Sequence, residues 1–216
     1  MLDQLRELVD EVRVWWQKRT PVVRIADVRD GQFVRIAGRI VDGEPLTAPI
    51  TARTCVCFDA GVFGHAQLDR RRDVIGEPMF AWQTLTRRLQ GRPFVVDDGS
   101  GTALVDPRGA VVQLRLDVRT DSLTAYPDAD PELAALRGRH EKIEWGEGVL
   151  QVGEEVVVLA RATVGRADDP ALYRASSDAR IHLAGAPERA AIISKLPEDL
   201  ARVGRERRAR RALAPG

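Results

Sequence analysis

The stretch RPFVVDDGSGTALVDPRGA, residues 92–110, indicates the fold more directly than any other part of the chain. Two runs of β-forming residues, 93–96 and 102–105, flank the pentapeptide DDGSG. The favoured two-residue hairpin turn needs positive φ at both central positions, which Asp and Gly tolerate. Asp98 and Gly99 therefore predict the tip of a hairpin between two strands.

The adjacent acids Asp97 and Asp98 do not fit three common kinds of site. A calcium loop spaces its carboxylates around a glycine and ends in a glutamate, and this stretch does not. No Gly-Lys-Ser/Thr sequence follows to hold a phosphate. Two acids that cleave a glycoside face each other across a cleft, which neighbouring residues rarely do. We interpret the stretch as structural.

Short apolar alternations recur on both sides of this hairpin. They predict strands in FVRIAGRIV (33–41), TCVCFDAGVF (54–63), AVVQLRLDV (110–118), EEVVVLARATV (154–164) and ARIHLAG (179–185). Gly38 inside the first of these indicates a bulge or bend. MFAWQTLTRRL (79–89) fits either a strand or a short helix after Pro78, and we favour the strand. Residues 64–78 are expected to form a loop, and the polar insertion at about 119–145 a short helix at 131–137.

Many short strands without alternating helices favour a closed antiparallel β structure over a parallel sheet. We predict a mainly β fold, with a single antiparallel OB-like or barrel-like domain over residues 21–194. An amphipathic N-terminal helix (1–20) and an Arg-rich C-terminal helix and tail (195–216) are expected to flank it.

The N-terminal segment carries its apolar residues on one helical stripe. Its candidate interface residues are Leu5, Leu8, Val12, Trp15 and Trp16. Two interpretations stay open: the stripe docks on the β domain, or it pairs with a second copy of the chain. The opposite face is slightly acidic, which is the reverse of what a membrane-surface helix needs.

The C-terminal segment begins with Pro197 and two acids, as helices often do. Its apolar stripe ends before a group of arginines, Arg205, Arg207, Arg208, Arg210 and Arg211. These residues are either a solvated helix end or a basic handle for an acidic partner, an anionic membrane surface or nucleic acid. The same two interpretations, solvated residues or a contact for an anion or nucleic acid, apply to three arginines in the loop expected at residues 64–78. They are Arg70, Arg71 and Arg72.

Composition limits the function classes. The 216 residues carry a net charge of only +1, so no global field attracts nucleic acid or lipid. No apolar run approaches the roughly 20 residues of a membrane span, and acids within the first helix exclude a signal peptide. We expect a cytoplasmic protein.

No motif indicates catalysis, a cofactor or a metal. The two cysteines and three scattered histidines are too few and wrongly spaced for a structural zinc module. No nucleophile occupies a Gly-x-Ser-x-Gly elbow. Cys55 is expected to be a buried strand residue rather than a reactive thiol. An active site assembled only in space stays open as a hypothesis.

Five segments in order resemble the GIDE-type domain, also called the beside-a-membrane domain: VRIAGRI, EPLTAPITARTCVCF, PFVVDDGSGTALVDPRGA, GEEVVVLARATV and AIISKLPEDL. The similarity covers residues 22–200. Members of this family include membrane-anchored ubiquitin ligases and bacterial proteins. The resemblance implies a compact β domain that serves for interaction or substrate docking.

The chain departs from the ligases in two respects. It has no RING cysteines, and helices with charged residues stand where the ligases have membrane spans. Ubiquitin transfer and membrane insertion are therefore not implied. The leading hypothesis is a non-enzymatic docking module that binds a protein partner or self-associates. The alternatives are an OB-like binder of nucleic acid or another polyanion, and an accessory domain of a ligase-like family without transferase activity.

Overall fold

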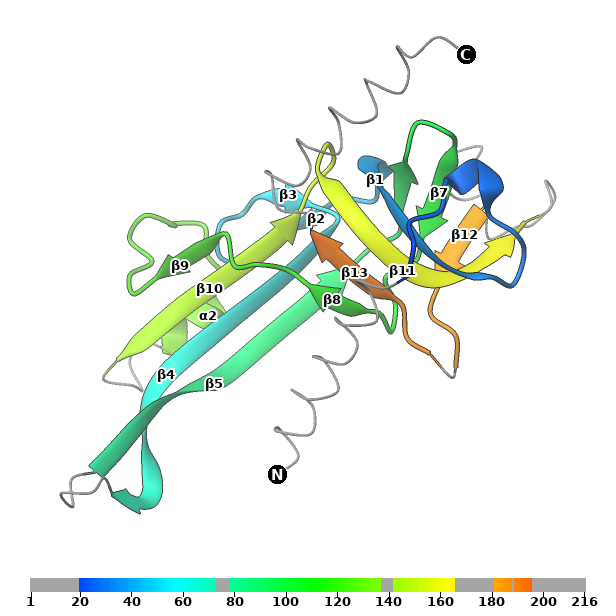
Figure 1. Cartoon of the computed structure of the whole chain (residues 1–216). Coiled ribbons are helices and arrows are strands. Elements are labelled where there is room, and N and C mark those ends of the chain that lie inside the picture. The colour runs from blue at the N-terminus through cyan, green and yellow to red at the C-terminus, as the bar shows by residue number, and fades with distance from the viewer. Residues whose placement is uncertain (1–19, 73–77, 137–141, 166–180, 188, 196–216) are drawn as a thin grey trace, which may run out of the picture. The chain divides into compact units, whose positions relative to one another are not determined.

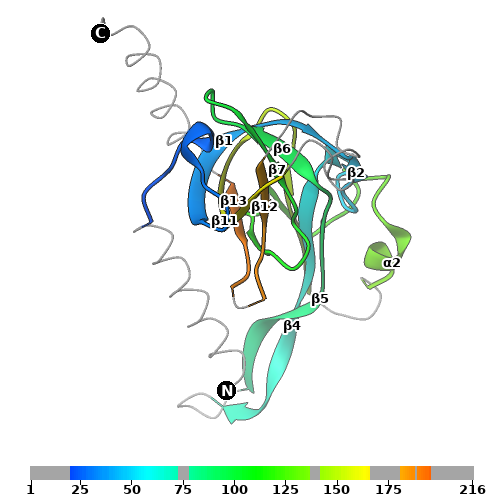
Figure 2. The same cartoon turned by 90° about the vertical axis from the view of Figure 1, so that its right-hand side faces the viewer.

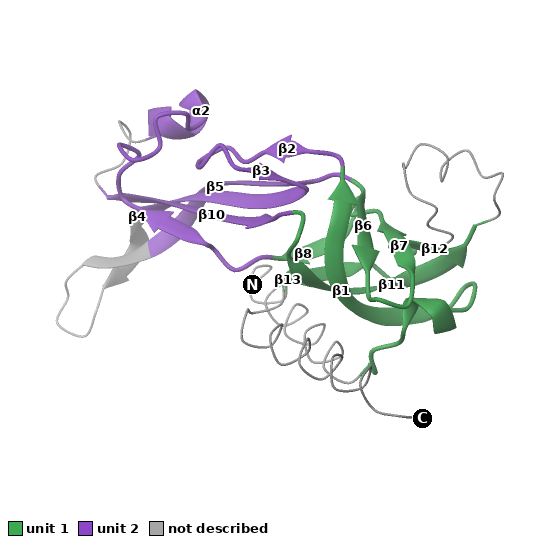
Figure 3. Cartoon of the chain, turned by 90° about the horizontal axis from the view of Figure 1, so that it is seen from above, with its two compact units in different colours: residues 1–43, 93–113, 152–216 green, residues 44–92, 114–151 purple. Residues whose placement is uncertain are grey.

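A computed structural model of the chain describes residues 20–72, 78–136, 142–165, 181–187 and 189–195, apart from the side chains of 65–72 and 78–81. The chain divides into two compact units (Figure 3). Unit 1 comprises Met1–Gly43, Pro93–Gln113 and Val152–Gly216, and unit 2 comprises Glu44–Arg92 and Leu114–Gln151. The helices predicted at the two ends of the chain lie outside the described residues.

Unit 1 contains a closed β-barrel (Figures 1 and 2). Its five strands are β1 (Phe33–Gly43), β6 (Phe94–Asp97), β7 (Thr102–Val105), β11 (Glu155–Val164) and β12 (Ile181–Ala184). They follow the order β1-β6-β7-β12-β11, and β11 pairs again with β1. The mainly β class and the barrel are thereby confirmed.

The expectation of an antiparallel barrel is wrong at one pairing, because β7 and β12 run parallel. The other pairings in the ring are antiparallel. A closed ring with an odd number of strands cannot alternate in direction all the way round, so one parallel pair is a geometric necessity.

β1 turns a corner of the barrel, as its glycine predicted. Phe33 to Arg39 pair with β11, and the strand then passes to β6 with a register shift between Ile40 and Asp42. A Cβ atom on Gly38 would lie 2.5 Å from the carbonyl oxygen of Asp97. Only glycine allows the two strands to approach so closely.

Alternate residues of β1 point into the core of unit 1, as in a half-buried strand, whereas β11 is buried on both faces over Glu155–Ala160. The fully buried members are Val34, Ile36, Ile40, Phe94, Val96, Ala103, Val105, Val156, Val158, Leu159, Ala160, Ala162 and Leu183. Branched aliphatic residues dominate this set because they fit the pleated surface of a sheet.

The DDGSG turn joins β6 to β7, so the hairpin prediction is confirmed. Gly99 has φ +82°. Asp98 accepts hydrogen bonds from the amides of Ser100 and Ile25, each over 2.8 Å. Ile25 begins the 3₁₀ turn η1 (Ile25–Asp27). Asp98 therefore connects the turn between β6 and β7 to the first residue of η1.

Two further strands extend the barrel sheet. β13 (Ile192–Lys195) pairs antiparallel with β11 and parallel with β8 (Val111–Gln113). The single strand expected over residues 110–118 is instead two, because β9 (Val118–Thr120) belongs to unit 2. Residues 114–117 between them form no strand, although their apolar alternation continues.

Unit 2 is built on a four-stranded sheet with the order β5-β4-β10-β9. β4 (Cys57–Arg72), β5 (Pro78–Gly91) and β10 (Ile143–Leu150) are its long strands. β2 (Leu46–Thr47) and β3 (Thr54–Cys55) form a separate small hairpin. The strand expected over residues 79–89 is confirmed.

Two features of unit 2 differ from the sequence expectation. The loop expected at residues 64–78 is wrong, because β4 continues to Arg72 and pairs with β5 as far as Pro78. β10 was missing from the expected strands, since its sequence, IEWGEGVL, interrupts the apolar alternation with two acids and two glycines. Hydrogen bonding between strands needs no apolar pattern, so sequence alternation does not reveal it.

One side of this sheet is covered by a core of ten buried residues. They are Ala48, Ile50, Cys55, Phe58, Ala60, Val62, Leu133, Ile143, Trp145 and Val149. Trp145 is fully buried and donates its indole N–H to the carbonyl of Leu133 over 3.1 Å. This bond fixes α2 (Pro131–Ala134), which lies within the range predicted to be helical. None of the helices in the described ranges is long and apolar enough to span a bilayer.

Candidate functional site

β5 is the outermost strand of the unit 2 sheet, and among the described residues only β4 pairs with it. The amide of Arg92 donates to the carbonyl of Val56 over 2.9 Å. In an antiparallel ladder, residue pairs that share hydrogen bonds alternate with pairs that do not. Arg92 and Val56 are a hydrogen-bonded pair, so Gln90, which lies two residues earlier and opposite Phe58, belongs to the next one. Gln90 therefore bonds to β4, while Leu89 directs its N–H and C=O away from it. Leu89 is 45% exposed, so this backbone edge is open.

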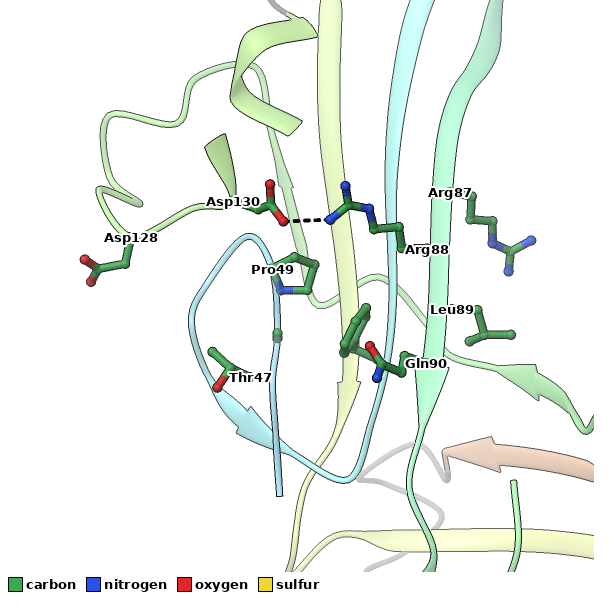
Figure 4. A pocket seen from close by; sticks show the side chains of 10 residues that line it. Thr47, Pro49, Arg87, Arg88, Leu89, Gln90, Asp128 and Asp130 are labelled. Carbon is green, nitrogen blue, oxygen red and sulfur yellow. Dashed lines mark hydrogen bonds and ion pairs between the residues drawn. The ribbon is translucent and has the colours of Figure 1, made fainter. Parts of the chain in front are cut away.

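A cavity of about 620 Å³ lies over one face of the sheet, with its other lining segments on the β4 side of β5 (Figure 4). It is lined by residues 47–49, Phe58, residues 87–90, Asp128 and Asp130. Arg88 and Gln90 point to one side of β5, whereas Arg87 and Leu89 point to the other (Figure 4).

The inner wall of the cavity is apolar. Phe58 is 5% exposed and belongs to the unit 2 core. Ala48 and Pro49 face the cavity from the loop between β2 and β3. The carbonyl of Pro49 accepts the amide of Asp130 over 2.7 Å, so the two segments that cover the cavity are tied together.

A buried carboxylate holds this covering loop in place. Glu147 of β10 is fully buried and accepts the amide of Ile50 over 2.7 Å and that of Thr51 over 3.4 Å. The hydroxyl of Thr51 donates to its other oxygen. Ala52, the next residue, has φ 55°, a left-handed conformation that costs an alanine about 1 kcal/mol. The carboxylate thus stabilises a strained loop.

The cluster around Glu147 has the chemistry of a structural clamp. Arg53 donates from Nε to the Thr51 hydroxyl over 2.9 Å, and its Nη2 lies 3.7 Å from Glu147 and 3.5 Å from Asp117. The Thr51 hydroxyl is therefore engaged both as donor and as acceptor. Burial, reinforced by the charge of Glu147, raises the pKa of the Cys55 thiol to about 11. The thiol stays protonated at neutral pH, as expected for a buried strand cysteine.

Ion pairs border the cavity. Arg88 contacts Asp130 over 2.6 Å and also Glu132. The amide of Glu132 and then Arg88 lower the pKa of Asp130, and hydrogen bonding to Asp130 raises that of Arg88. Arg87 contacts Asp59 over 2.5 Å. Each arginine is thus held by a carboxylate.

The structure assigns none of the candidate residues from the sequence to this cavity. Arg70, Arg71 and Arg72 lie on β4 rather than in a loop, and nothing is described of their side chains. The remaining candidates lie outside the described residues: Leu5, Leu8, Val12, Trp15, Trp16, Arg205, Arg207, Arg208, Arg210 and Arg211.

The residues of the open edge and the cavity were not singled out by sequence. Leu89, Pro49 and Asp128 lie in three separate stretches of the chain. One signal was available: the run from Met79 to Gln90 is β-forming and contains no acidic residue. That run indicates a strand, but it does not indicate that the strand lies at an edge.

Comparison with known proteins gives no relative: no family model, no curated protein and no solved structure matches the chain. Among the described residues, no group of three or more His, Cys, Asp or Glu side chains is arranged to hold a metal ion. The geometry of the open edge is therefore the basis for a functional assignment.

Proposed function

We propose that this protein is a non-enzymatic docking module that binds an extended segment of a partner protein as an additional strand on β5. The open backbone of β5 at Leu89 carries this proposal. In strand addition, main-chain hydrogen bonds supply affinity and pockets for alternate side chains supply specificity. The open edge of β5 supplies the first of these requirements.

Over residues 86–91 the edge has no lysine, proline or bulge to oppose pairing. Sheet edges are usually blunted by lysines, prolines, bulges or a covering segment. A register shift opposite Val62 and Phe63 interrupts β5 near Leu85, but the following residues 86–91 pair regularly. The arginines at 87 and 88 are held by carboxylates of the same unit. Leu89 between them is left accessible to a partner strand.

The resemblance to the GIDE-type domain supports the same function, since that family is associated with interaction and substrate docking. The barrel is consistent with the expected OB-like fold. Its strands β1, β6 and β7 are consecutive in the barrel, and β11 returns to lie beside β1, which is a Greek-key order. OB folds are five-stranded Greek-key barrels that commonly serve as binding modules.

The test is selection from a phage-displayed library of random linear peptides on the full chain. We expect selected peptides to bind the wild type and Leu89→Ala alike, because alanine keeps the backbone N–H. Leu89→Pro removes that donor and is expected to weaken binding at least about tenfold, the effect of roughly 1.4 kcal/mol. Equal binding to the proline variant, or no enrichment of peptides, would contradict the proposal.

A second candidate function rests on the hairpin of β4 and β5. β10 accompanies β4 only as far as Gly64, so the three arginines at 70–72 lie on a two-stranded ribbon. A ribbon of this kind fits the major groove of DNA. Asp69, Asp73 and Glu77 balance the three arginines, which disfavours this function. Salt-dependent binding to duplex DNA that is lost on replacing Arg70, Arg71 and Arg72 by serine would establish it.

A further inference from the structure

We propose that residues 1–19 pack their apolar stripe on the outer face of β11, within unit 1. The observation behind this inference is that β11 is buried on both faces over Glu155–Ala160, although the barrel core accounts for only one of them. The inference is independent of strand addition to β5. It selects between the two interpretations that the sequence left open for the stripe, docking on the β domain and pairing with a second copy.

The register of the sheet shows which residues of β11 point out of the barrel. Val158 is fully buried in the barrel core. Successive side chains of a strand point to opposite faces, so Val157 and Leu159 point outward. Leu159 lies opposite Arg35 of β1 and opposite Ile192 of β13. These neighbours therefore share the outer face with it.

The outward apolar residues are buried as deeply as those of the core. Leu159 is 0% exposed, Ile192 5% and Val157 6%. β1 and β13 lie beside β11 within the sheet, so they cover the flanks of these side chains but not their ends. A further apolar segment therefore lies over this face.

The chain reaches this face at Thr20, the first described residue. The amide of Val23 donates to the carbonyl of Arg35 over 2.9 Å, which places Val22 and Val23 beside β1. Nη1 of Arg35 donates to the carbonyl of Thr20 over 3.3 Å. Because the side chain of Arg35 belongs to the outer face, the chain before Thr20 begins at that face.

Residues 1–19 have the length and the side chains to cover it. A helix of 19 residues is about 28 Å long, whereas three neighbouring strands span about 10 Å. Two tryptophans come four and five residues before Thr20, so they are the first large side chains to reach the face. The predicted stripe consists of Leu5, Leu8, Val12, Trp15 and Trp16.

The C-terminal segment fits the face less well. It follows Lys195 of β13 directly, so it also starts close to the face. Its predicted stripe has only three aliphatic residues before the arginines, Leu196, Leu200 and Val203. Aromatic side chains bury far more area, about 150–250 Å² each. The N-terminal segment, with two tryptophans, is therefore the better cover.

The first test is methyl NMR spectroscopy of the full chain. An indole ring that lies over a methyl group changes the resonance of that group. We therefore expect Trp16→Ala to shift the methyl resonances of Leu159 and Ile192. The resonances of Val62, which is buried in the core of unit 2, should stay in place. Leu200→Ala is the matched control in the C-terminal segment and should shift none of them.

The second test is trypsin cleavage within residues 1–19, which contain four basic sites. Val157→Glu places a charge in the outer face and is expected to speed cleavage there at least about tenfold, because cleavage follows the population of the undocked form. Val164→Glu, at a 41% exposed position of the same strand, should change nothing. Val157→Glu combined with Trp16→Glu should be no faster than either alone, because residues in one contact are not additive.

Each result supports the docking or overturns it. If Trp16→Ala leaves Leu159 and Ile192 unchanged, or if the two glutamate variants act additively, the inference is wrong. If Leu200→Ala shifts these resonances instead, the C-terminal segment covers the face. If the shifts caused by Trp16→Ala disappear on dilution as a dimer dissociates, the stripe comes from a second copy and the intramolecular docking is wrong.

Discussion

Replacing Glu147 by glutamine should destabilise unit 2 strongly without changing the size of the side chain. The carboxylate is fully buried and accepts the amides of Ile50 and Thr51 and the hydroxyl of Thr51. A glutamine amide nitrogen turns one accepting position into a donor that faces another donor. Arg53 also loses a buried counter-charge at 3.7 Å.

The magnitude follows from these contacts. A hydrogen bond to a charged group contributes about 1.5–3 kcal/mol, and breaking a buried ion pair costs about 3–5 kcal/mol. Since glutamine keeps one accepting oxygen and Asp117 still neutralises Arg53, we expect a loss of about 3 kcal/mol. For a chain of this size that lowers the melting temperature by about 6–12 °C.

The assay is urea unfolding followed by the indole N–H resonance of Trp145, which is buried in the same unit. Glu144→Gln is the matched control, because Glu144 lies on the same strand and pairs with an Arg119 side chain that is 64% exposed. Exposed pairs contribute at most about 1 kcal/mol. A loss for Glu147→Gln no larger than the loss for Glu144→Gln would refute the clamp.

Three further predictions concern the turn, the thiols and acid stability. Gly99→Val should lower the free energy of unfolding in urea titrations by about 1–2 kcal/mol. The cause is the φ of +82° alone, since a Cβ atom there meets nothing within 4 Å. Gly99→Asn should cost far less, because asparagine tolerates the left-handed region. Burial raises the pKa of Cys55 to about 11 and that of Cys57 to about 12. Neither thiol should therefore react with Ellman's reagent at pH 8 until the protein unfolds. Rapid labelling of the native protein would count against their burial. Burial alone would raise the pKa of Asp106, but the hydrogen bonds from Arg108 outweigh it and lower the pKa below 3.8. Because the pKa in the folded state lies below that in the unfolded state, the free energy of unfolding should fall as the pH drops through and below 3.8. Thermal melts of Asp106→Asn should show a smaller fall.

The sequence predicted the parts of the fold that depend on local chemistry. Gly99 predicted the hairpin because tolerance of positive φ is a property of glycine itself. The positive φ expected at Asp98 is not observed, and Asp98 instead holds the turn through its carboxylate. Gly38 predicted a corner because its lack of a side chain allows β1 and β6 to approach closely. The parallel pairing of β7 and β12 was not predicted, because it is a property of the closed ring rather than of either segment.

The candidate site was beyond sequence reasoning for a related reason. Its lining comes from four separate parts of the chain, around Pro49, Phe58, Leu89 and Asp128. Whether a strand lies at an edge depends on which other strands pair with it, and β10, the central neighbour of β4, was itself concealed by Glu147 and two glycines. The same acid that obscured the strand holds the loop that covers the cavity.

The pairing of β1 with β11 has a consequence for synthesis on the ribosome. Phe33 pairs with Arg161, and closure of the ring at β7 needs β12, which ends at Ala184. All of unit 2 has emerged by Gln151. During translation β1 therefore waits without its main partner while the second unit is completed, and its exposed apolar residues are available to chaperones for that interval. Slower elongation across residues 44–151 would prolong this vulnerable state.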